Sequence, residues 1–216
     1  MSNLLTTLGG YLINLPWLEL VAMLLALAYV VLAAQGSIWC WPAAFISTAI
    51  YTVIFYDVSL LMDSALNVYY LVMAVYGYWI WQRKPQHQQS TPLLAIVSWQ
   101  PTWHLKACIV LTIISFVLGY IMANNTTASF PYLDTFTTVF AVFATYLVTQ
   151  KVLENWLYWV VIDAISIYLY IEKGLIPTTV LFVIYVVIAT YGYFKWQNIY
   201  KRSNLKQSQV SNMVTS

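Results

Sequence analysis

The sequence predicts an all-α integral membrane protein with seven transmembrane helices. Of its 216 residues, 62% are hydrophobic and only 7% are charged, whereas a soluble domain carries about 25% charged residues. Mostly apolar runs of the length that crosses a bilayer, about 20 residues, recur along the chain. The basic residues are also distributed unequally between alternate connections, as in multi-pass membrane proteins. We expect the lipid bilayer, and no nucleic acid, as a partner.

The apolar runs place each span in order. The expected spans are 17–35, 39–56, 64–82, 104–123, 133–150, 156–171 and 177–197. The first run is not a signal peptide, because no Lys or Arg precedes it and Glu19 stands at its start. The polar C-terminal segment 201–216 is rich in Ser, Asn and Gln, and we expect a disordered cytoplasmic tail there.

The basic residues fix the expected orientation. If seven spans alternate, eight of the nine Lys and Arg residues fall on one side of the membrane: Arg83, Lys84, Lys106, Lys151, Lys195, Lys201, Arg202 and Lys206. Cytoplasmic connections are enriched in these residues. We therefore expect a multi-pass protein of the cell (cytoplasmic or inner) membrane, with its N-terminus outside and its C-terminus in the cytoplasm.

An internal repeat divides the expected spans into two halves. The sequence from Tyr76 to Gln82 returns with few changes from Tyr191 to Gln197, and the ungapped alignment of 35–82 with 150–197 has 15 identities in 48 positions. Equivalent positions are separated by four spans, so the two copies run the same way through the membrane. The expected organisation is 3+1+3: a first three-helix repeat in 1–82, a loop and linker helix in 83–132, and a second repeat in 133–200. Parallel repeats of this kind are typical of transporters, with a site where the halves meet.

The residues that could hold a solute centre on the sixth span. Asp163 lies in the middle of this apolar run, where an ionisable side chain indicates a functional site. Trp156 and Trp159 share one helical face with it. A carboxylate beside indole rings suits a flat, cationic ligand. The alternative is that the tryptophans anchor the helix at the membrane interface and that the aspartate bonds a neighbouring helix.

Other candidate ligands come from the remaining spans of the two halves. They are Trp41 and Thr48 on the second span, Asn67 and Tyr70 on the third, and Tyr185 on the seventh. Thr48 is the repeat equivalent of Asp163, so a carboxylate is present in one half only. The amide of Asn67 needs a partner inside a membrane, and a hydrogen bond between helices would serve it as well as a ligand.

The sequence indicates a transport protein rather than an enzyme. We find no pairing of a nucleophile with a base, no nucleotide-binding loop and no metal-binding pattern, and we expect no cofactor. Cys40 and Cys108 have no spacing typical of a metal site or a disulfide framework.

The motif Glu154-Asn155-Trp156-Leu157-Tyr158-Trp159, followed by Asp163, and the Tyr-Gly-aromatic ends of the third and seventh spans resemble the PnuC family of vitamin transporters. The resemblance covers all seven spans. It implies the 3+1+3 architecture, a homotrimer with one pathway in each protomer, and facilitated diffusion of a vitamin that a cytoplasmic kinase then phosphorylates. It also implies that Trp156 and Trp159 stack on the aromatic ring of the ligand.

The resemblance leaves the substrate open between two cationic aromatic vitamins, thiamine and nicotinamide riboside. A carboxylate at Asp163 could accept a hydrogen bond from the aminopyrimidine of thiamine, whereas amides serve a ribose well, so the sequence favours thiamine over nicotinamide riboside. A SWEET-like sugar carrier, which would have no need of Asp163, is a further alternative. A membrane channel or scaffold, in which the aromatic residues only anchor helices, is an alternative of another class.

Overall fold

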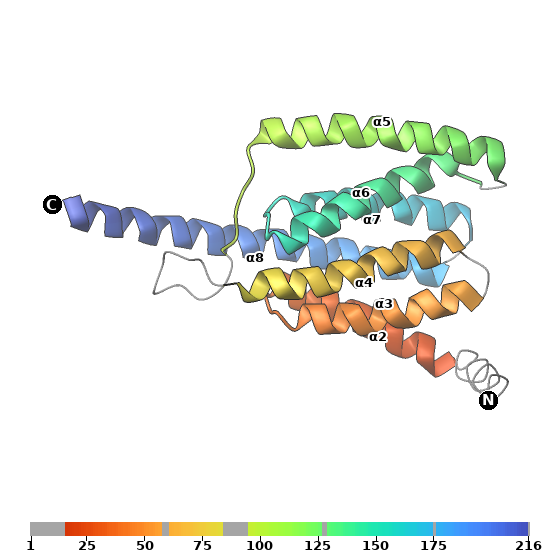
Figure 1. The fold of residues 1–216 in the computed structure, drawn as a ribbon, viewed down its shortest axis with the longest axis horizontal. Coiled ribbons are helices and arrows are strands. Elements are labelled where there is room, and N and C mark those ends of the chain that lie inside the picture. The colour runs from red at the N-terminus through yellow and green to blue at the C-terminus, as the bar shows by residue number, and fades with distance from the viewer. Residues whose placement is uncertain (1–15, 58–60, 84–94, 127–128, 175, 216) are drawn as a thin grey trace. The chain divides into compact units, whose positions relative to one another are not determined.

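The computed structural model describes residues 16–57, 61–83, 95–126, 129–174 and 176–215. The chain divides into two compact units, Met1–Lys84 and Pro85–Ser216. We describe each unit by itself (Figure 1). The described residues form seven helices, and every helix overlaps one of the expected spans.

The first unit is a bundle of three helices, α2 (Pro16–Ala34), α3 (Cys40–Asp57) and α4 (Leu61–Gln82). α3 packs against both other helices. Hydroxyl groups reach across these contacts: Ser47 on α3 donates to the carbonyl oxygen of Ala22 on α2 at 2.8 Å, and Ser64 on α4 donates to that of Thr52 on α3 at 2.9 Å. Such small hydroxyl residues let helices approach closely and bond to one another in lipid.

The second unit contains α5 (Pro101–Asn125), α6 (Pro131–Thr149), α7 (Asn155–Glu172) and α8 (Ile176–Thr215). Each helix packs against the next one along the chain. Both α5 and α6 begin with a proline, which is favoured there because the first helical N–H has no intrahelical partner. A core of Phe140, Ala141, Ala144 and Ile162 fills the space between α6 and α7.

Each unit contains the same pair of tryptophans in the same geometry. Trp41 of α3 meets Trp81 of α4 edge to face, with ring centroids 5.3 Å apart and planes at 87°. Trp156 of α7 meets Trp196 of α8 in the same way, at 5.4 Å and 90°. The residues are related by the 115-residue offset found in the sequence.

The helix ends before these tryptophans also match. Gly36 after α2 and Lys151 after α6 both have positive φ angles, 72° and 51°. In both places the residue that follows donates its N–H to a carbonyl oxygen five residues earlier, Ser37 to Leu32 and Val152 to Leu147. This is the Schellman motif, in which a left-handed residue ends a helix. Lysine adopts that conformation less readily than glycine does.

The C-terminal segment differs from the sequence prediction. We expected the last span to end near residue 197 and 201–216 to be a disordered tail, whereas α8 continues as one helix to Thr215. After Gly192 the segment contains no proline or glycine, the residues that end helices most strongly, and Lys, Arg, Leu, Gln and Met favour continuation. In Figure 1 this part of α8 extends past the ends of α5, α6 and α7.

The outer faces of the helices are apolar. By length and composition, four described helices are able to cross a membrane, over Trp17–Ala34, Pro101–Asn125, Pro131–Thr149 and Thr178–Leu205. The described parts of all seven helices expose large hydrophobic side chains, including Ile113 on α5 at 58% and Val187 on α8 at 63%. A continuous exposed apolar surface is unfavourable in water and suits the interior of a bilayer.

Candidate functional site

The carboxyl group of Asp163 is a buried ionisable group within a helix of the second unit. Asp163 lies near the middle of α7 and is only 4% exposed. Within the part of the chain that the structure describes, its side chain makes no hydrogen bond or ion pair. Burying a carboxyl group without a partner is costly. The interpretation in which Asp163 bonds a neighbouring helix therefore gains no support among the described residues, and the carboxyl group stays a candidate for ligand binding.

Trp159 lies one helical turn before Asp163 and differs from Trp156 in its surroundings. It is partly buried and packs against the core of Phe140, Ala141, Ala144 and Ile162. One side of its indole ring is thus fixed by α6 and α7, and part of the residue stays accessible. An aromatic ring held in this way, close to a carboxyl group on the same helix, can bind a cationic ring without a large loss of side-chain freedom.

Trp156 is enclosed by its own unit. It is 2% exposed, and its ring covers Gly192 so closely that a Cβ atom at that glycine would lie 2.8 Å from the indole. Its other neighbour is the edge of Trp196. These contacts give Trp156 a packing role, and its indole Nε1 is buried without a hydrogen-bond partner among the described residues.

The first unit places Trp41 in the equivalent position. Trp41 is 2% exposed, packs against Trp81, and covers Gly77 in the way that Trp156 covers Gly192. Thr48 uses its hydroxyl group within α3, where it donates to the carbonyl oxygen of Ala44 at 2.8 Å. The hydroxyl group of Thr48 is thus engaged within its helix, whereas the indole Nε1 of Trp41 is buried without a hydrogen-bond partner among the described residues.

The remaining candidates are partly buried, and the two tyrosines among them lie beside other aromatic rings. Asn67 and Tyr70 belong to α4, and the ring of Tyr70 lies 5.7 Å from that of Tyr69. Tyr185 of α8 contacts Phe182 edge to face at 5.6 Å, and Phe182 in turn lies 5.1 Å from Tyr170 of α7. Asn67, Tyr70 and Tyr185 each already take part in an interaction within the protein.

A polar cluster that the sequence analysis did not find fastens the start of α7. The carboxylate of Glu154 accepts hydrogen bonds from the hydroxyl group of Ser98 and from the backbone N–H of Trp99, the latter at 3.3 Å. Nε2 of His104 lies 3.5 Å from the same carboxylate, and Nδ1 of His104 lies 3.0 Å from the hydroxyl group of Tyr158. The donors come from residues about 50 positions away, so sequence proximity gave no signal.

The backbone joins the same two segments. The N–H of Val97 donates to the carbonyl oxygen of Lys151 at 3.0 Å, and the N–H of Leu153 donates to that of Val97 at 2.8 Å. These bonds form a single parallel bridge between Val97 and Val152. The segment 95–100, which we call the strap, thus binds the turn between α6 and α7. The described residues contain no cluster of His, Cys, Asp and Glu that could hold a metal ion.

The seven described helices with their apolar outer faces define a multi-pass membrane protein. The comparisons give the family. The chain belongs to the nicotinamide mononucleotide transporter family, whose model matches residues 16–198. The homologous relatives are named as transporters, and the assignment to the PnuC family is confirmed.

Relatives of known name match most of the chain. The nicotinamide riboside transporter PnuC of Escherichia coli (strain K12) is 24% identical over 212 residues, which cover 88% of this chain and 88% of that protein. The protein of the same name from Haemophilus influenzae is 26% identical over 195 residues, covering 87% and 82%. The riboflavin/roseoflavin transporter RibM of Streptomyces davaonensis is 22% identical over 184 residues, covering 85% of both chains.

A solved structure has the same fold. The crystal structure of the vitamin B3 transporter PnuC matches with a TM-score of 0.69 at 22% identity, covering 86% of this chain and 83% of the other. All-helical architecture and multi-pass membrane location are therefore established for this chain. Of the two vitamins considered from the sequence, nicotinamide riboside stands in the names of the Escherichia coli and Haemophilus influenzae relatives, and thiamine stands in none of the three names.

Proposed function

We propose that this protein transports nicotinamide riboside across the membrane, with Asp163 as the group that binds the positive charge of the ligand. The relatives named for this substrate support the choice, and it replaces thiamine, which the sequence favoured. The observation that carries the proposal is the buried carboxyl group of Asp163, which has no partner among the described residues. The pyridinium ring of nicotinamide riboside is positively charged, so it would pair with the carboxyl group of Asp163.

Trp159 is the aromatic group that we assign to the pyridinium ring. The separation of four residues puts Trp159 and Asp163 on one face of α7. An electron-rich indole face and a carboxyl group in a medium of low polarity both favour a flat cation over a neutral sugar. We propose Asn67 and Tyr70 in the first unit, and Tyr185 in the second, as further hydrogen-bonding groups, because amide and phenol groups both donate and accept. Within their own units, Trp41 and Trp156 contribute through packing, and Thr48 bonds within α3.

The finer architecture belongs to the same proposal. We propose seven spans in a 3+1+3 arrangement, with the N-terminus outside and the C-terminus in the cytoplasm. The matching Trp41–Trp81 and Trp156–Trp196 pairs and the matching helix ends at Gly36 and Lys151 support the repeat. Facilitated diffusion, phosphorylation of the vitamin by a cytoplasmic kinase, and assembly as a homotrimer complete the proposal by analogy with the family.

A binding titration of the purified protein tests the substrate and the site together. Tryptophan fluorescence or calorimetry would be followed with nicotinamide riboside, thiamine, riboflavin and a neutral sugar. We expect saturable binding of nicotinamide riboside, weakened at least tenfold by Asp163→Asn and unchanged by Asp134→Asn. Asp134 is the matched control, because it is half-buried and paired with Lys173 at 3.5 Å.

Each other outcome contradicts a defined part of the proposal. Tighter binding of thiamine would return the substrate to the one that the sequence favoured. Tight binding of riboflavin would indicate a riboflavin transporter similar to RibM. Because riboflavin is uncharged, Asp163 would then not serve to neutralise a cation. Sugar binding that Asp163→Asn leaves intact would indicate a sugar carrier. No binding of any vitamin would favour a channel or scaffold.

A further inference from the structure

One arrangement of side chains recurs on the outer faces of three helices and is not used by the proposed transport site. A stripe of exposed aliphatic residues runs along the helix, an exposed aromatic residue lies beyond one end of the stripe, and a cation lies over the aromatic ring. The stripe on α4 is Val68, Val72 and Val75, on α5 it is Val110, Ile113 and Val117, and on α8 it is Val180, Ile184 and Val187.

The three cations make close contact with their rings. The guanidinium of Arg83 lies 3.4 Å from the ring centre of Trp79 on α4. Nζ of Lys106 lies 5.1 Å from the ring of Trp103 on α5, and Nζ of Lys195 lies 5.5 Å from the ring of Tyr191 on α8. The three rings are more than half exposed. In a membrane these rings face the boundary between acyl chains and headgroups, where tryptophan and tyrosine are favoured.

We propose that this arrangement is a binding surface for anionic phospholipids, and that the strongest binding site is on α8. The acyl chain lies along the aliphatic stripe, and the phosphate group binds the cation beyond the aromatic ring. On α8 the exposed Lys201 and Arg202 follow Lys195 within two turns. A helix of 40 residues is about 60 Å long, twice the hydrocarbon thickness of about 30 Å, so these cations lie beyond the end of the apolar stripe.

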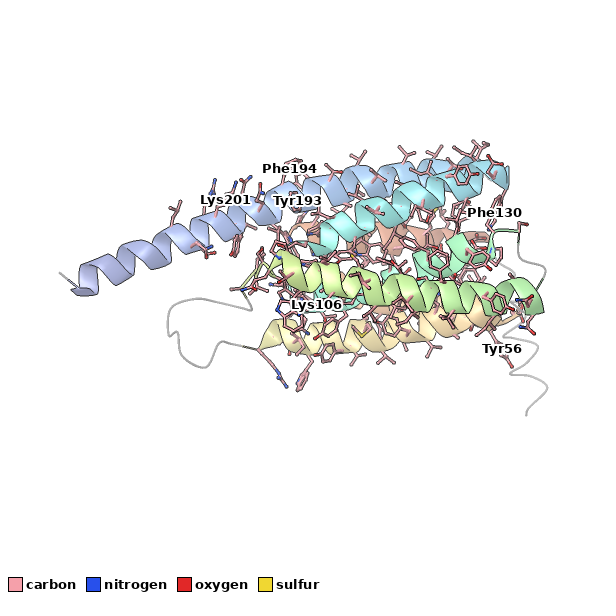
Figure 2. All side chains as sticks on the ribbon, turned by 90° about the horizontal axis from the view of Figure 1, so that it is seen from above. Tyr56, Lys106, Phe130, Tyr193, Phe194 and Lys201 are labelled. Carbon is pink, nitrogen blue, oxygen red and sulfur yellow. The ribbon has the colours of Figure 1, made fainter. Side chains whose placement is uncertain are left out.

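The positive charge around the proposed site on α8 suits an anionic ligand. No Asp or Glu occurs after Glu172 in the sequence. Among the described residues, neither Lys195, Lys201 nor Arg202 has an acidic partner. Figure 2 shows Lys106 on α5 and Lys201 on α8 toward the same end of the second unit, with Phe130 at the opposite end. Clusters of Lys and Arg just beyond a membrane span attract anionic headgroups, by about 1 kcal/mol for each cation.

Lys173, at the other end of the second unit, differs from the cations of α8 because it has an acidic partner. Lys173 also lies over an aromatic ring, that of Tyr170, at 5.9 Å. Its ammonium group is 3.5 Å from the carboxylate of Asp134, which already supplies the negative charge. Lys173 therefore has an internal partner where the cations of α8 have none, and it serves as a matched control.

The test compares lipid binding of the purified full-length protein and two variants in a neutral detergent. Thermal unfolding and native mass spectrometry would be measured with added phosphatidylglycerol or phosphatidylcholine. We expect phosphatidylglycerol alone to stabilise the wild type and Lys173→Gln. The triple variant Lys195→Gln, Lys201→Gln, Arg202→Gln should bind it about 100-fold more weakly, from about fivefold for each cation. Added salt should also weaken the binding, since exposed charges are screened.

Several results would overturn the proposal. Equal stabilisation by phosphatidylcholine would show that headgroup charge is irrelevant, and undiminished phosphatidylglycerol binding by the triple variant would place the lipid elsewhere. Competition by soluble glycerol 3-phosphate at similar concentration would indicate a site for free phosphate rather than a lipid. If the triple variant does not fold, Arg202→Gln alone should show the fivefold loss, and full binding by it would contradict the assignment.

Discussion

The indole rings of Trp156 and Trp196 meet edge to face, with centroids 5.4 Å apart and planes at 90°. Both residues are buried, and the flat face of Trp156 lies directly on Gly192. Edge-to-face aromatic pairs add about 0.5–1.5 kcal/mol beyond the area that they bury. The same contact, formed by Trp41 and Trp81 over Gly77, holds the first unit together. The glycines are required by this close approach, because any side chain would occupy the space of the indole ring.

Gly192→Ala should therefore destabilise the protein. The added methyl group would lie 2.8 Å from the ring carbons of Trp156, and Trp196 prevents the indole from moving aside. We expect a loss of about 1–3 kcal/mol from overpacking, partly offset by up to about 1 kcal/mol from the better helix propensity of alanine. Thermal unfolding in detergent measures the change. The exposed Thr190→Ala on the same helix is the control and should change stability by less than about 0.5 kcal/mol.

A smaller ring at position 156 should restore part of this loss. Trp156→Phe opens space above Gly192, so the double variant with Gly192→Ala should be more stable than the sum of the two single effects predicts. Strict additivity in the unfolding measurements would show that the methyl group and the indole do not meet, and would contradict the packing role of Trp156.

The two tryptophans of the WxxW motif should have separable roles. Trp156 is enclosed by its own unit, whereas Trp159 is partly accessible and lies one turn before Asp163. We expect Trp159→Leu to weaken nicotinamide riboside binding at least tenfold with a small change in melting temperature. Trp156→Leu should lower the melting temperature and leave the affinity of the folded fraction close to that of the wild type. Equal losses of affinity in the two variants would instead support stacking by both rings.

The sequence predicted the helices well, because each apolar run is bounded by polar residues or by a proline. All seven predicted starts lie within three residues of the observed helix starts. The end of α8 was wrong because composition alone does not end a helix, and the segment after Gly192 contains no residue that breaks one. Hydrophobicity reports where a chain enters lipid, whereas helix propensity decides how far the helix continues beyond it.

The site was predicted less completely, for a physical reason. Aromatic residues on one helical face look the same in the sequence whether they pack on a neighbouring helix or meet a ligand. Trp156 was assigned to a ligand from the helical face that it shares with Asp163 and from the family resemblance, whereas its contact with Trp196 joins residues 40 positions apart. Asp163 was recognisable from its chemistry, because an ionisable carboxyl group within an apolar span is energetically costly and indicates a functional role.

Glu154→Ala should release the strap from the turn between α6 and α7. The carboxylate holds the hydroxyl group of Ser98 and the N–H of Trp99 and lies beside His104. Losing these contacts should cost about 1–3 kcal/mol. Hydrogen exchange at the N–H groups of Val97 and Leu153, which bond across the two segments, should become faster.

The control for this variant is Glu172→Ala at the other end of α7, which is exposed and outside the cluster. Ser98→Ala should show a smaller loss of stability in the same direction. Unchanged exchange at Val97 in Glu154→Ala would show that the backbone bridge holds the strap without the carboxylate, and would remove Glu154 from that role.

Asp163→Asn should make the empty protein more stable and the ligand-bound protein less so. A buried carboxylate without a hydrogen-bond partner is held at a cost, and the neutral amide of the same shape reduces that cost. We expect the free energy of unfolding without ligand to rise by about 1–3 kcal/mol. Nicotinamide riboside at 100 times its Kd should stabilise the wild type by about 2.7 kcal/mol and stabilise the variant far less. Melting curves with and without ligand measure both effects, and Asp134→Asn should show neither. A lower melting temperature of the ligand-free variant would mean that the carboxylate is satisfied within the folded protein, and Asp163 would then be a structural residue.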